Sequence, residues 1–413
     1  MAEASLKLGG SWATKEGSLL GFNDENGNYK PIPFDFTRAT TATRVNRDGL
    51  IEEVQSGVPR IDFSNGDGSL LLEPQRTNLV TYSEDFSQSV WGTWRSTKTL
   101  SNNINPKGIN GYYEISHTGN SSNNPNTRLT NVSLNGSYTL SFFVKINQSR
   151  YISLSIEDYD GDRASVYFDT INKTFTTISN VGSPITNTSY SEFSNDWIRI
   201  SLSVNLLNAV YNEVGIGIYN PSGSFPSASG EVISVFGSQL EQGSYATSYI
   251  PTSGSAVTRS ADVCNNAGNS NVFNDSEGVL YAEIAALADD DTFRFITLSD
   301  GTSNNTVRIY LYNAIYGRVL VGGAEQCVFS TTSYNVTDYN KIAILYSENN
   351  FKMYVNGSQV GTTDTSGSIF PQGTLDELSF HRGDSQFKFY GNCKNLQVFN
   401  EALSDSELIA LTT

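Results

Sequence analysis

The chain has 413 residues, with 42 acidic and 26 basic side chains and a net charge of −16. This acidic balance argues against a nucleic-acid-binding surface, which needs clustered Lys and Arg to displace counterions. The length exceeds that of one ordinary sandwich and predicts two or three domains. The composition predicts an all-β protein, because charged residues are few and aromatic, β-branched and turn-forming residues are many.

Several classes of site are not supported by the residue pattern. No apolar run reaches the ~20 residues of a membrane helix, and no leader pattern follows Met1, so we expect neither membrane insertion nor a secretory leader. Cys264, Cys327 and Cys393 show no zinc or redox spacing and are expected as buried thiols. His117 and His381 are the two histidines, and no motif places either beside a nucleophile.

The first block, residues 1–84, contains short extended segments broken by Gly, Pro and Asn. Thr43–Val45 and Leu50–Val54 flank an Asp-Gly turn and predict a hairpin. The block has too little periodic apolar sequence for a core of its own, so we expect it to lean on a neighbouring domain or on another subunit.

Basic residues concentrate in this first block and suggest a docking surface for an acidic partner. The candidates are Arg38, Arg44 and Arg47, together with Arg60 and Arg76. The alternative is that these arginines brace turns and pair with Glu52, Glu53 or Asp62.

Two similar stretches, Leu70–Trp94 and Gln239–Asp262, bracket a run of alternating sequence and predict the entrance and exit of one module. Pro74 ends the first apolar strand because proline lacks an N–H group. Trp91 and Trp94 lie in polar surroundings and are candidate sugar-stacking residues. The alternative is that both rings pack between the connector and the module's core.

The second block, residues 85–259, has at least five strands with period-2 alternation, for example Tyr138–Ile146 and Trp197–Val204, and predicts an antiparallel jelly roll. Asp158, Asp160 and Asp162 form a candidate calcium site, although the Gly spacing does not match an EF-hand. A hairpin turn is the alternative. The run Asp289–Asp291 has the same two interpretations.

Residues 260–270 predict a linker, and residues 271–413 a second sandwich that folds on its own. Asn356-Gly357 predicts a type I′ turn, and Ser404 with Glu407 predicts a capped terminal helix. Tyr310, Tyr312 and Tyr316 are candidate glycan-binding residues on an outer sheet face, with plain sheet surface as the alternative. Glu377 has no partner at glycosidase spacing, so we expect no enzyme activity.

The stretches Phe36–Phe63, Leu70–Trp94 and Gln239–Asp262 resemble the connector of a family of bacteriophage virion proteins, fibre-like or minor structural proteins. Members carry a carbohydrate-binding-module-like jelly roll and a laminin-G-like, concanavalin A-type sandwich. The hairpin around Asn356 is similar to the core hairpin of the latter, although Asn340 and Lys341 stand where that family has Trp.

The resemblance implies an all-β, multidomain protein: an N-terminal virion-attachment region (1–84), a jelly roll (85–259) and a lectin-like sandwich (271–413). It implies a fibre or appendage that binds host-surface glycans, carried on the virion after synthesis in the host cytoplasm. The alternatives are an architectural head or tail decoration protein and a polysaccharide-degrading tail enzyme. Expected partners are other virion proteins, two further copies of the chain in a trimer, and host polysaccharide. No cofactor is expected unless the three aspartates bind calcium.

Overall fold

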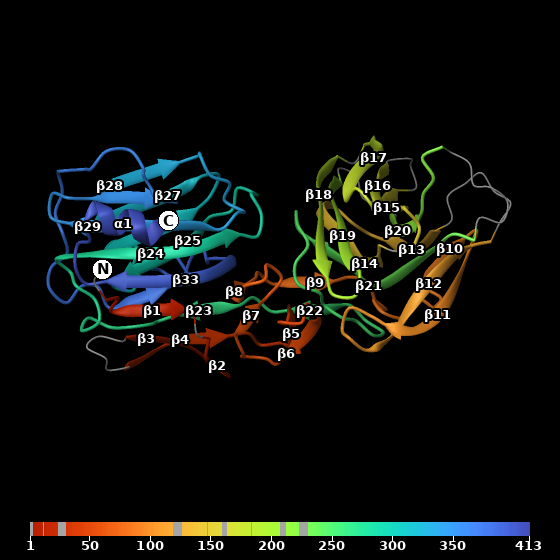
Figure 1. Cartoon of the computed structure of the whole chain (residues 1–413), viewed down its shortest axis with the longest axis horizontal. Coiled ribbons are helices and arrows are strands. Elements are labelled where there is room, and N and C mark those ends of the chain that lie inside the picture. Colours follow the sequence, from red (N-terminus) through yellow and green to blue (C-terminus); the bar gives the residue numbers. More distant parts are fainter. Residues whose placement is uncertain are drawn as a thin grey trace. The chain divides into compact units, whose positions relative to one another are not determined.

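The computed structural model describes residues 3–10, 12–23, 30–118, 126–146, 148–158, 163–182, 184–206, 212–222 and 230–413. These residues form antiparallel strands and one α-helix, α1 (Asp405–Thr412) (Figure 1). The predicted all-β class with antiparallel sandwiches is confirmed. No helix in the described ranges has the length and apolar character needed to cross a membrane.

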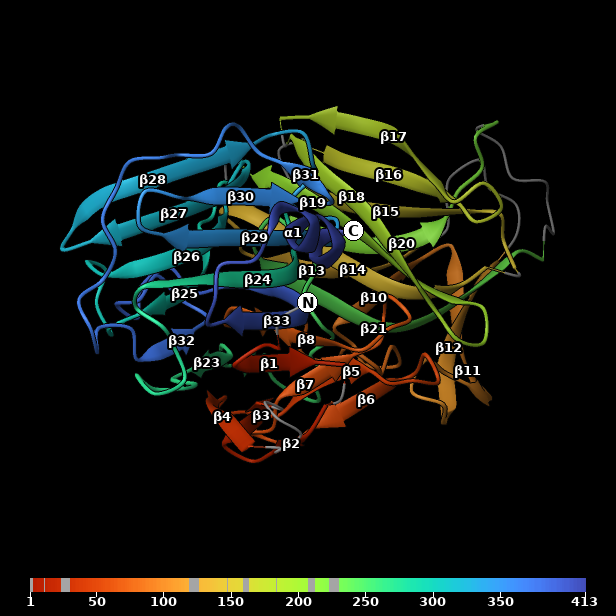
Figure 2. The same ribbon diagram turned by 60° about the vertical axis from the view of Figure 1, so that its left-hand side comes forward.

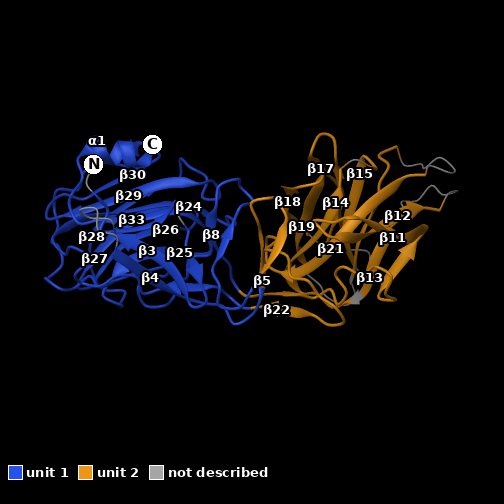
Figure 3. Cartoon of the chain, turned by 60° about the horizontal axis from the view of Figure 1, so that its bottom comes forward, with its two compact units in different colours: residues 1–41, 54–74, 260–413 blue, residues 42–53, 75–259 orange. Residues whose placement is uncertain are grey.

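The chain forms two compact units (Figure 3). Unit 1 contains residues 1–41, 54–74 and 260–413, and unit 2 contains residues 42–53 and 75–259. This division differs from the predicted one, which separated residues 1–84 from residues 271–413. The difference arises because strands from the two ends of the chain pair within one sheet.

Unit 1 contains two sheets. In the described residues the larger sheet has the order β23 (Val263–Asn265), β4 (Lys30–Thr37), β3 (Ser18–Asn23), β1 (Leu6–Gly9), β33 (Gly391–Phe399), β24 (Glu277–Ala286), β29 (Asn340–Ser347), β30 (Lys352–Val355) and β31 (Ser358–Gln359). Beside this path, β2 (Thr14–Lys15) pairs with β3, and β7 (Arg60–Asp62) pairs with β8 (Ser69–Leu72). The smaller sheet has the order β28 (Ala324–Thr331), β27 (Ile315–Val321), β26 (Thr306–Leu311), β25 (Arg294–Ser299) and β32 (Glu377–Ser379).

The N-terminal strands complete the edge of β33. Strand β1 pairs antiparallel with β33, with Leu6 opposite Val398, and β8 pairs with the first residues of β33. Leu6, Leu8 and Phe34 are fully buried in the same core as Leu280 and Ile309. These N-terminal strands therefore fill one side of the C-terminal sandwich, and β4 buries Ile32, Phe34 and Phe36 with the period-2 alternation that the sequence expectation overlooked.

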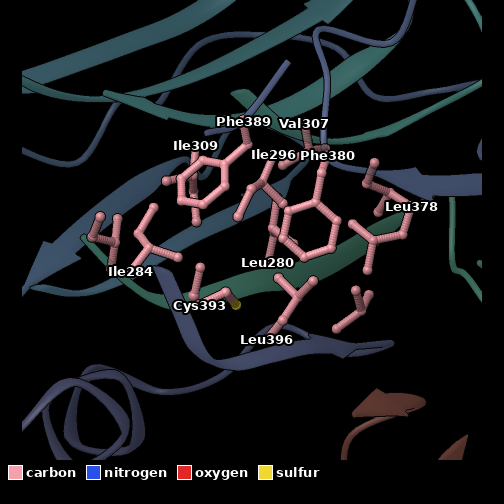
Figure 4. Packing of buried hydrophobic residues seen from close by; sticks show 14 of the residues in the cluster. Leu280, Ile284, Ile296, Val307, Ile309, Leu378, Phe380, Phe389, Cys393 and Leu396 are labelled. Carbon is pink, nitrogen blue, oxygen red and sulfur yellow. The ribbon is translucent and has the colours of Figure 1, made fainter. Parts of the chain in front are cut away.

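The core of unit 1 lies between its two sheets. Figure 4 shows side chains of the larger sheet, among them Leu280 and Leu396, packed against Ile296 and Val307 of the smaller sheet. All three cysteines are buried without a disulfide, as predicted. Burial raises the pKa of the Cys327 thiol to about 12, which keeps that thiol protonated and unreactive at neutral pH.

The opposite face of the larger sheet is covered by helix α1. Figure 2 shows α1 lying over β24 and β29, and Leu403 and Leu408 pack there with Tyr281 and Leu345. The predicted capping box is confirmed, since Ser404 accepts from the Glu407 N–H and the Glu407 side chain accepts from the Ser404 N–H.

The predicted turn between β30 and β31 is confirmed as well. Asn356 and Gly357 have φ values of 48° and 79°, the left-handed conformation that a type I′ turn needs at both positions.

Unit 2 is a sandwich of two sheets, as predicted for residues 85–259. In its described residues the first sheet, here the β15 sheet, has the order β10 (Trp91–Trp94), β13 (Asn126–Val132), β20 (Asn212–Ile218), β15 (Tyr151–Asp158), β16 (Arg163–Asp169) and β17 (Thr174–Val181). The second, the β14 sheet, has the order β11 (Ser96–Ile104), β12 (Asn110–His117), β21 (Val232–Gln242), β14 (Gly136–Lys145), β19 (Trp197–Leu206) and β18 (Ile185–Phe193). Alternating residues such as Leu140 and Leu154 fill the core between them.

The predicted entrance and exit of the module meet within unit 2. Strand β9 (Arg76–Asn78) pairs with β22 (Val257–Arg259). The Asn78 amide donates to the carbonyl oxygens of Ser238 (3.0 Å) and Ile250 (2.8 Å). The predicted N-terminal hairpin is β5 (Ala42–Val45) and β6 (Ile51–Val54), and residues 42–53 also belong to unit 2.

Candidate functional site

The candidate docking arginines Arg38 and Arg60 are buried and cannot present charge to a partner. Their exposed fractions are 2% and 0%. Arg38 Nη1 lies 3.0 Å from Asp262 Oδ1, and Arg60 binds both Asp262 and Glu73. Burial lowers the pKa of Arg60, but the charges of Asp262 and Glu73 outweigh burial and raise that pKa above its ordinary value. This is a correction: the two guanidinium groups hold together three segments of unit 1.

The other arginines of that group differ in exposure. Arg47 is exposed, in the turn between β5 and β6. Arg44 pairs with Glu52 at 2.9 Å, which agrees with the structural alternative. Arg76 Nε lies 3.8 Å from the buried carboxylate of Glu241.

The candidate calcium site is not described by the structure. Asp160 and Asp162 lie outside the described residues, as does the side chain of Asp158. In the second aspartate run, Asp290 Oδ1 lies 2.6 Å from Arg294 Nη2. Within the described ranges, no group of three His, Cys, Asp or Glu side chains is arranged to hold a metal ion.

Trp91 is a core residue and not a sugar platform, which corrects the binding interpretation. Its side chain is 2% exposed, its indole N–H donates to the Tyr82 carbonyl oxygen (2.8 Å), and its ring lies 4.7 Å from that of Phe86. The sandwich covers both ring faces, as the alternative stated.

Trp94 lies on the solvent-facing side of the β15 sheet and is 44% exposed. The guanidinium groups of Arg95 and Arg128 lie 5.3 and 5.6 Å from its ring centre. The register places Trp94 in one row with Tyr167, four strand spacings or about 19 Å away. The Tyr167 ring stacks on Tyr219 at 4.9 Å.

The candidate tyrosines of unit 1 lie on the solvent-facing side of its five-stranded sheet. Val307 and Ile309 of β26 point into the core, so Arg308 and Tyr310 point outward. Tyr310 lies between Phe295 of β25 and Tyr316 of β27, with 4.6 Å between ring centres on each side. The neighbouring rings cover both faces of Tyr310, which is 8% exposed, so Tyr310 supports the row and does not offer a free ring face.

The free aromatic surface lies beside this row. Phe293 stacks on Tyr312 at 4.2 Å, and Phe387 lies 5.6 Å from Phe293. Phe293 and Phe387 are 36% and 46% exposed. We call this group the aromatic face; it comprises Phe293, Phe295, Tyr310, Tyr312, Tyr316 and Phe387.

Arginines that were not predicted as site residues adjoin the aromatic face. Arg308 lies opposite Arg318 of β27, and the Arg382 guanidinium lies 4.7 Å from the Phe387 ring centre. Arg318 pairs with Glu325 at 2.7 Å, and Arg382 pairs with Asp384. The signal was present in the alternation of β26, where Arg308 shares a face with Tyr310.

Glu377, the carboxylate considered from the sequence as a catalytic candidate, lies on β32 of this sheet. Burial raises the pKa of Glu377, whose carboxylate accepts from Ser299 and Ser379 at 3.3 Å each. His381 is 3% exposed, and its Nδ1 accepts from the Gly383 N–H at 2.9 Å. His117 is 9% exposed and belongs to unit 2.

Three solved structures are similar to parts of this chain, each at a low TM-score. The CBM40 of the Ruminococcus gnavus IT-sialidase, bound to α2,3-sialyllactose, is 18% identical, with 36% of this chain and 94% of that chain covered and a TM-score of 0.31. Domains LG4-5 of the mouse laminin α1 chain are 10% identical, with 69% and 90% covered and a TM-score of 0.24. Trypanosoma rangeli sialidase is 10% identical, with 95% and 81% covered and a TM-score of 0.26. Similarity this weak does not justify assigning the ligand or the activity of these proteins to this chain.

A family match covers about a third of the chain. No curated protein matches the sequence. Residues 267–409 match the concanavalin A-like lectin/glucanases superfamily. That range begins before β24 and ends within α1, so it contains the whole five-stranded sheet and the aromatic face. Residues 267–409 therefore carry a concanavalin A-like lectin fold, as the resemblance implied.

Proposed function

We propose that the protein binds glycans without cleaving them, through the aromatic face of unit 1. The observation that supports this most is the exposed pair Phe293 and Phe387 beside the guanidinium of Arg382. Sugar C–H groups stack on ring faces, and polar side chains next to the rings bind the hydroxyl groups. The lectin fold of the same residues agrees with this function.

The test is retention of the full-length protein on immobilised host-surface polysaccharides, with the chain length of the polysaccharide measured before and after incubation. Tyr312→Ala and Phe387→Ala should each weaken retention about tenfold, the size of a strong interface residue. Ile409→Ala is the matched control, because Ile409 is an exposed apolar residue (44%) on α1, which covers the other sheet. Retention unchanged in both ring variants would contradict the proposal.

A Trp94→Ala variant tests whether unit 2 holds the site instead. Trp94 is 44% exposed on the β15 sheet, so loss of binding in this variant alone would move the site to that sheet. We expect no effect.

The absence of cleavage is tested by the chain-length measurement. We expect the polysaccharide to keep its length. If the polysaccharide is shortened, and Glu377→Gln stops the shortening, the polysaccharide-degrading enzyme is the better assignment.

We further propose that the protein is a bacteriophage fibre or appendage that assembles as a trimer and displays this face to the host. The support is the resemblance of the connector sequences Leu70–Trp94 and Gln239–Asp262 to those of phage virion proteins. An antibody against the protein should label intact virions, and light scattering should give three times the chain mass. Labelled virions with no glycan retention would instead favour the architectural decoration protein.

A further inference from the structure

We infer that the ligand of the aromatic face is an acidic glycan, whose carboxylate or sulfate group is bound by Arg308. This inference rests on the proposed glycan binding and adds the chemical class of the ligand.

Arg308 is a buried cation without a carboxylate partner in the part of the chain that the structure describes. It is 4% exposed. Its Nη2 donates to the Ser303 carbonyl oxygen at 2.7 Å, and its Nε has no hydrogen-bond partner among the described residues. A buried charge without a counter-ion destabilises a fold, so this position is costly unless a ligand supplies the anion.

The surrounding charges leave one positive charge uncompensated. Glu325 pairs with Arg318 and Asp384 pairs with Arg382, which leaves no carboxylate for Arg308 among the described ion pairs. Burial, followed by the charges of Arg318 and Arg382, lowers the pKa of Arg308 to about 10, although the charge of Asp384 acts in the opposite direction. Arg308 therefore stays protonated at neutral pH in surroundings that disfavour its charge.

Two hydroxyl groups accompany this guanidinium. Thr297 lies opposite Arg308 on β25, and Thr306 precedes it by two residues on β26, so all three point to the same side of the sheet. Both Oγ1 atoms are buried and have no hydrogen-bond partner among the described residues. A carboxylate or sulfate accepts hydrogen bonds from guanidinium and hydroxyl groups alike, whereas a neutral sugar would leave the charge uncompensated.

The net charge of the chain makes this inference testable. With −16 overall, the protein has no general attraction for polyanions, so retention on an acidic glycan must come from local groups such as Arg308. The aromatic face beside Arg308 predicts that the anion is part of a sugar and not a free inorganic ion.

The experiment measures binding of the full-length protein to an array in which each acidic glycan is printed beside a neutral form. Uronic and sialic acid glycans are paired with their carboxyl-reduced forms, and sulfated glycans with their desulfated forms. At least one acidic member should bind about tenfold or more tightly than its neutral form, since a hydrogen bond to a charged group contributes about 1.5–3 kcal/mol. A difference in affinity within the carboxyl-reduced pairs identifies the anion as a carboxylate. A difference within the desulfated pairs identifies it as a sulfate.

Arg308→Gln should abolish that preference, and Arg308→Lys should retain part of it, because Lys keeps the charge but not the guanidinium fork. Arg163→Gln, which removes a more exposed arginine of unit 2, should leave the preference unchanged. The thermal midpoint of Arg308→Gln should equal or exceed that of the wild type, since an uncompensated buried charge is removed.

The outcomes are distinguishable. Binding with equal affinity to both members of every pair would overturn the acidic ligand and leave glycan binding intact. No binding to any glycan would overturn both proposals. A lowered midpoint in Arg308→Gln with the acidic preference kept would show that Arg308 only supports the Ser303 loop.

Discussion

The two units are assembled from the chain in different ways. Unit 2 is built from the continuous stretch 75–259 and the short stretch 42–53, and all strands of its two six-stranded sheets lie within that one continuous stretch. Unit 1 combines three stretches, and β1 pairs with β33 from the other end of the chain. A module predicted from one stretch of sequence can therefore match a unit in one case and only part of a unit in the other.

The difference between the two units should have its largest effect on the stability of isolated fragments of the chain. Fragment 271–413 lacks five fully buried residues that residues 1–41 provide, Leu6, Leu8, Leu19, Phe34 and Phe36. At roughly 1.5–3 kcal/mol for each buried side chain, the loss is about 10 kcal/mol, which equals the whole stability of a typical domain. It also leaves the edge of β33 unpaired.

We therefore expect fragment 271–413 to show no cooperative melt by circular dichroism, whereas fragment 75–259 should melt cooperatively. This expectation replaces the one from sequence, in which residues 271–413 fold on their own. A sharp melt of fragment 271–413 would show that the N-terminal strands are dispensable.

The two units should also differ in how much stability is lost when an ion pair is broken, because the pairs tested are buried in unit 1 and partly exposed in unit 2. Asp262→Ala leaves the fully buried guanidinium of Arg38 without its carboxylate and removes one of two from Arg60. This should cost unit 1 about 3–5 kcal/mol in urea unfolding. The matched change in unit 2, Glu213→Ala, breaks a partly exposed pair with Arg128 and should cost less than about 1 kcal/mol. Equal losses would contradict the structural role of the buried cluster.

The β30–β31 turn should tolerate substitution poorly. Gly357→Val places a β-branched residue at φ 79° and brings its Cβ to 2.9 Å from Thr413 Oγ1, so unit 1 should lose about 1–3 kcal/mol. Gly322→Val is the control: its φ is 58°, but the space around its Cβ is open, so it should lose less. A thermal midpoint unchanged in Gly357→Val would indicate a different turn.

The smallest expected effect is a pH dependence of opposite sign in the two units. Hydrogen bonds from Ser87 and Gln88 lower the pKa of Asp85 in unit 2, so its contribution is present above about pH 4 and is lost as the pH falls further. Burial raises the pKa of Glu377 in unit 1, so its charge costs stability at pH 7, and that cost disappears on acidification.

Melting curves at pH 7 and pH 3 check these signs. Asp85→Asn should lower the midpoint of unit 2 at pH 7, and this loss should be smaller at pH 3, where the unfolded chain already binds a proton at Asp85 while the folded chain keeps the carboxylate ionised. Glu377→Gln should raise the midpoint of unit 1 at pH 7 and have little effect at pH 3. The same difference from wild type at both pH values would contradict the link to titration.

Features that depend on a few neighbouring residues could be predicted from the sequence. The alternation around Leu140 predicted a core-facing strand, Asn356-Gly357 predicted the turn, and Ser404 with Glu407 predicted the helix cap. Period-2 alternation also placed Tyr310 on an outer face. In each case the physical cause acts over one strand or one turn.

Pairing and burial could not be predicted in this way, because they depend on residues that are distant in the sequence. Trp91 and Trp94 look alike as candidates, yet one is covered by the sandwich core and the other is exposed at its surface. Arg38 and Arg308 are both buried arginines, but Asp262 neutralises only Arg38. Whether a charge or a ring can meet a ligand is decided by what packs over it, and in this protein those covering groups come from distant strands and loops.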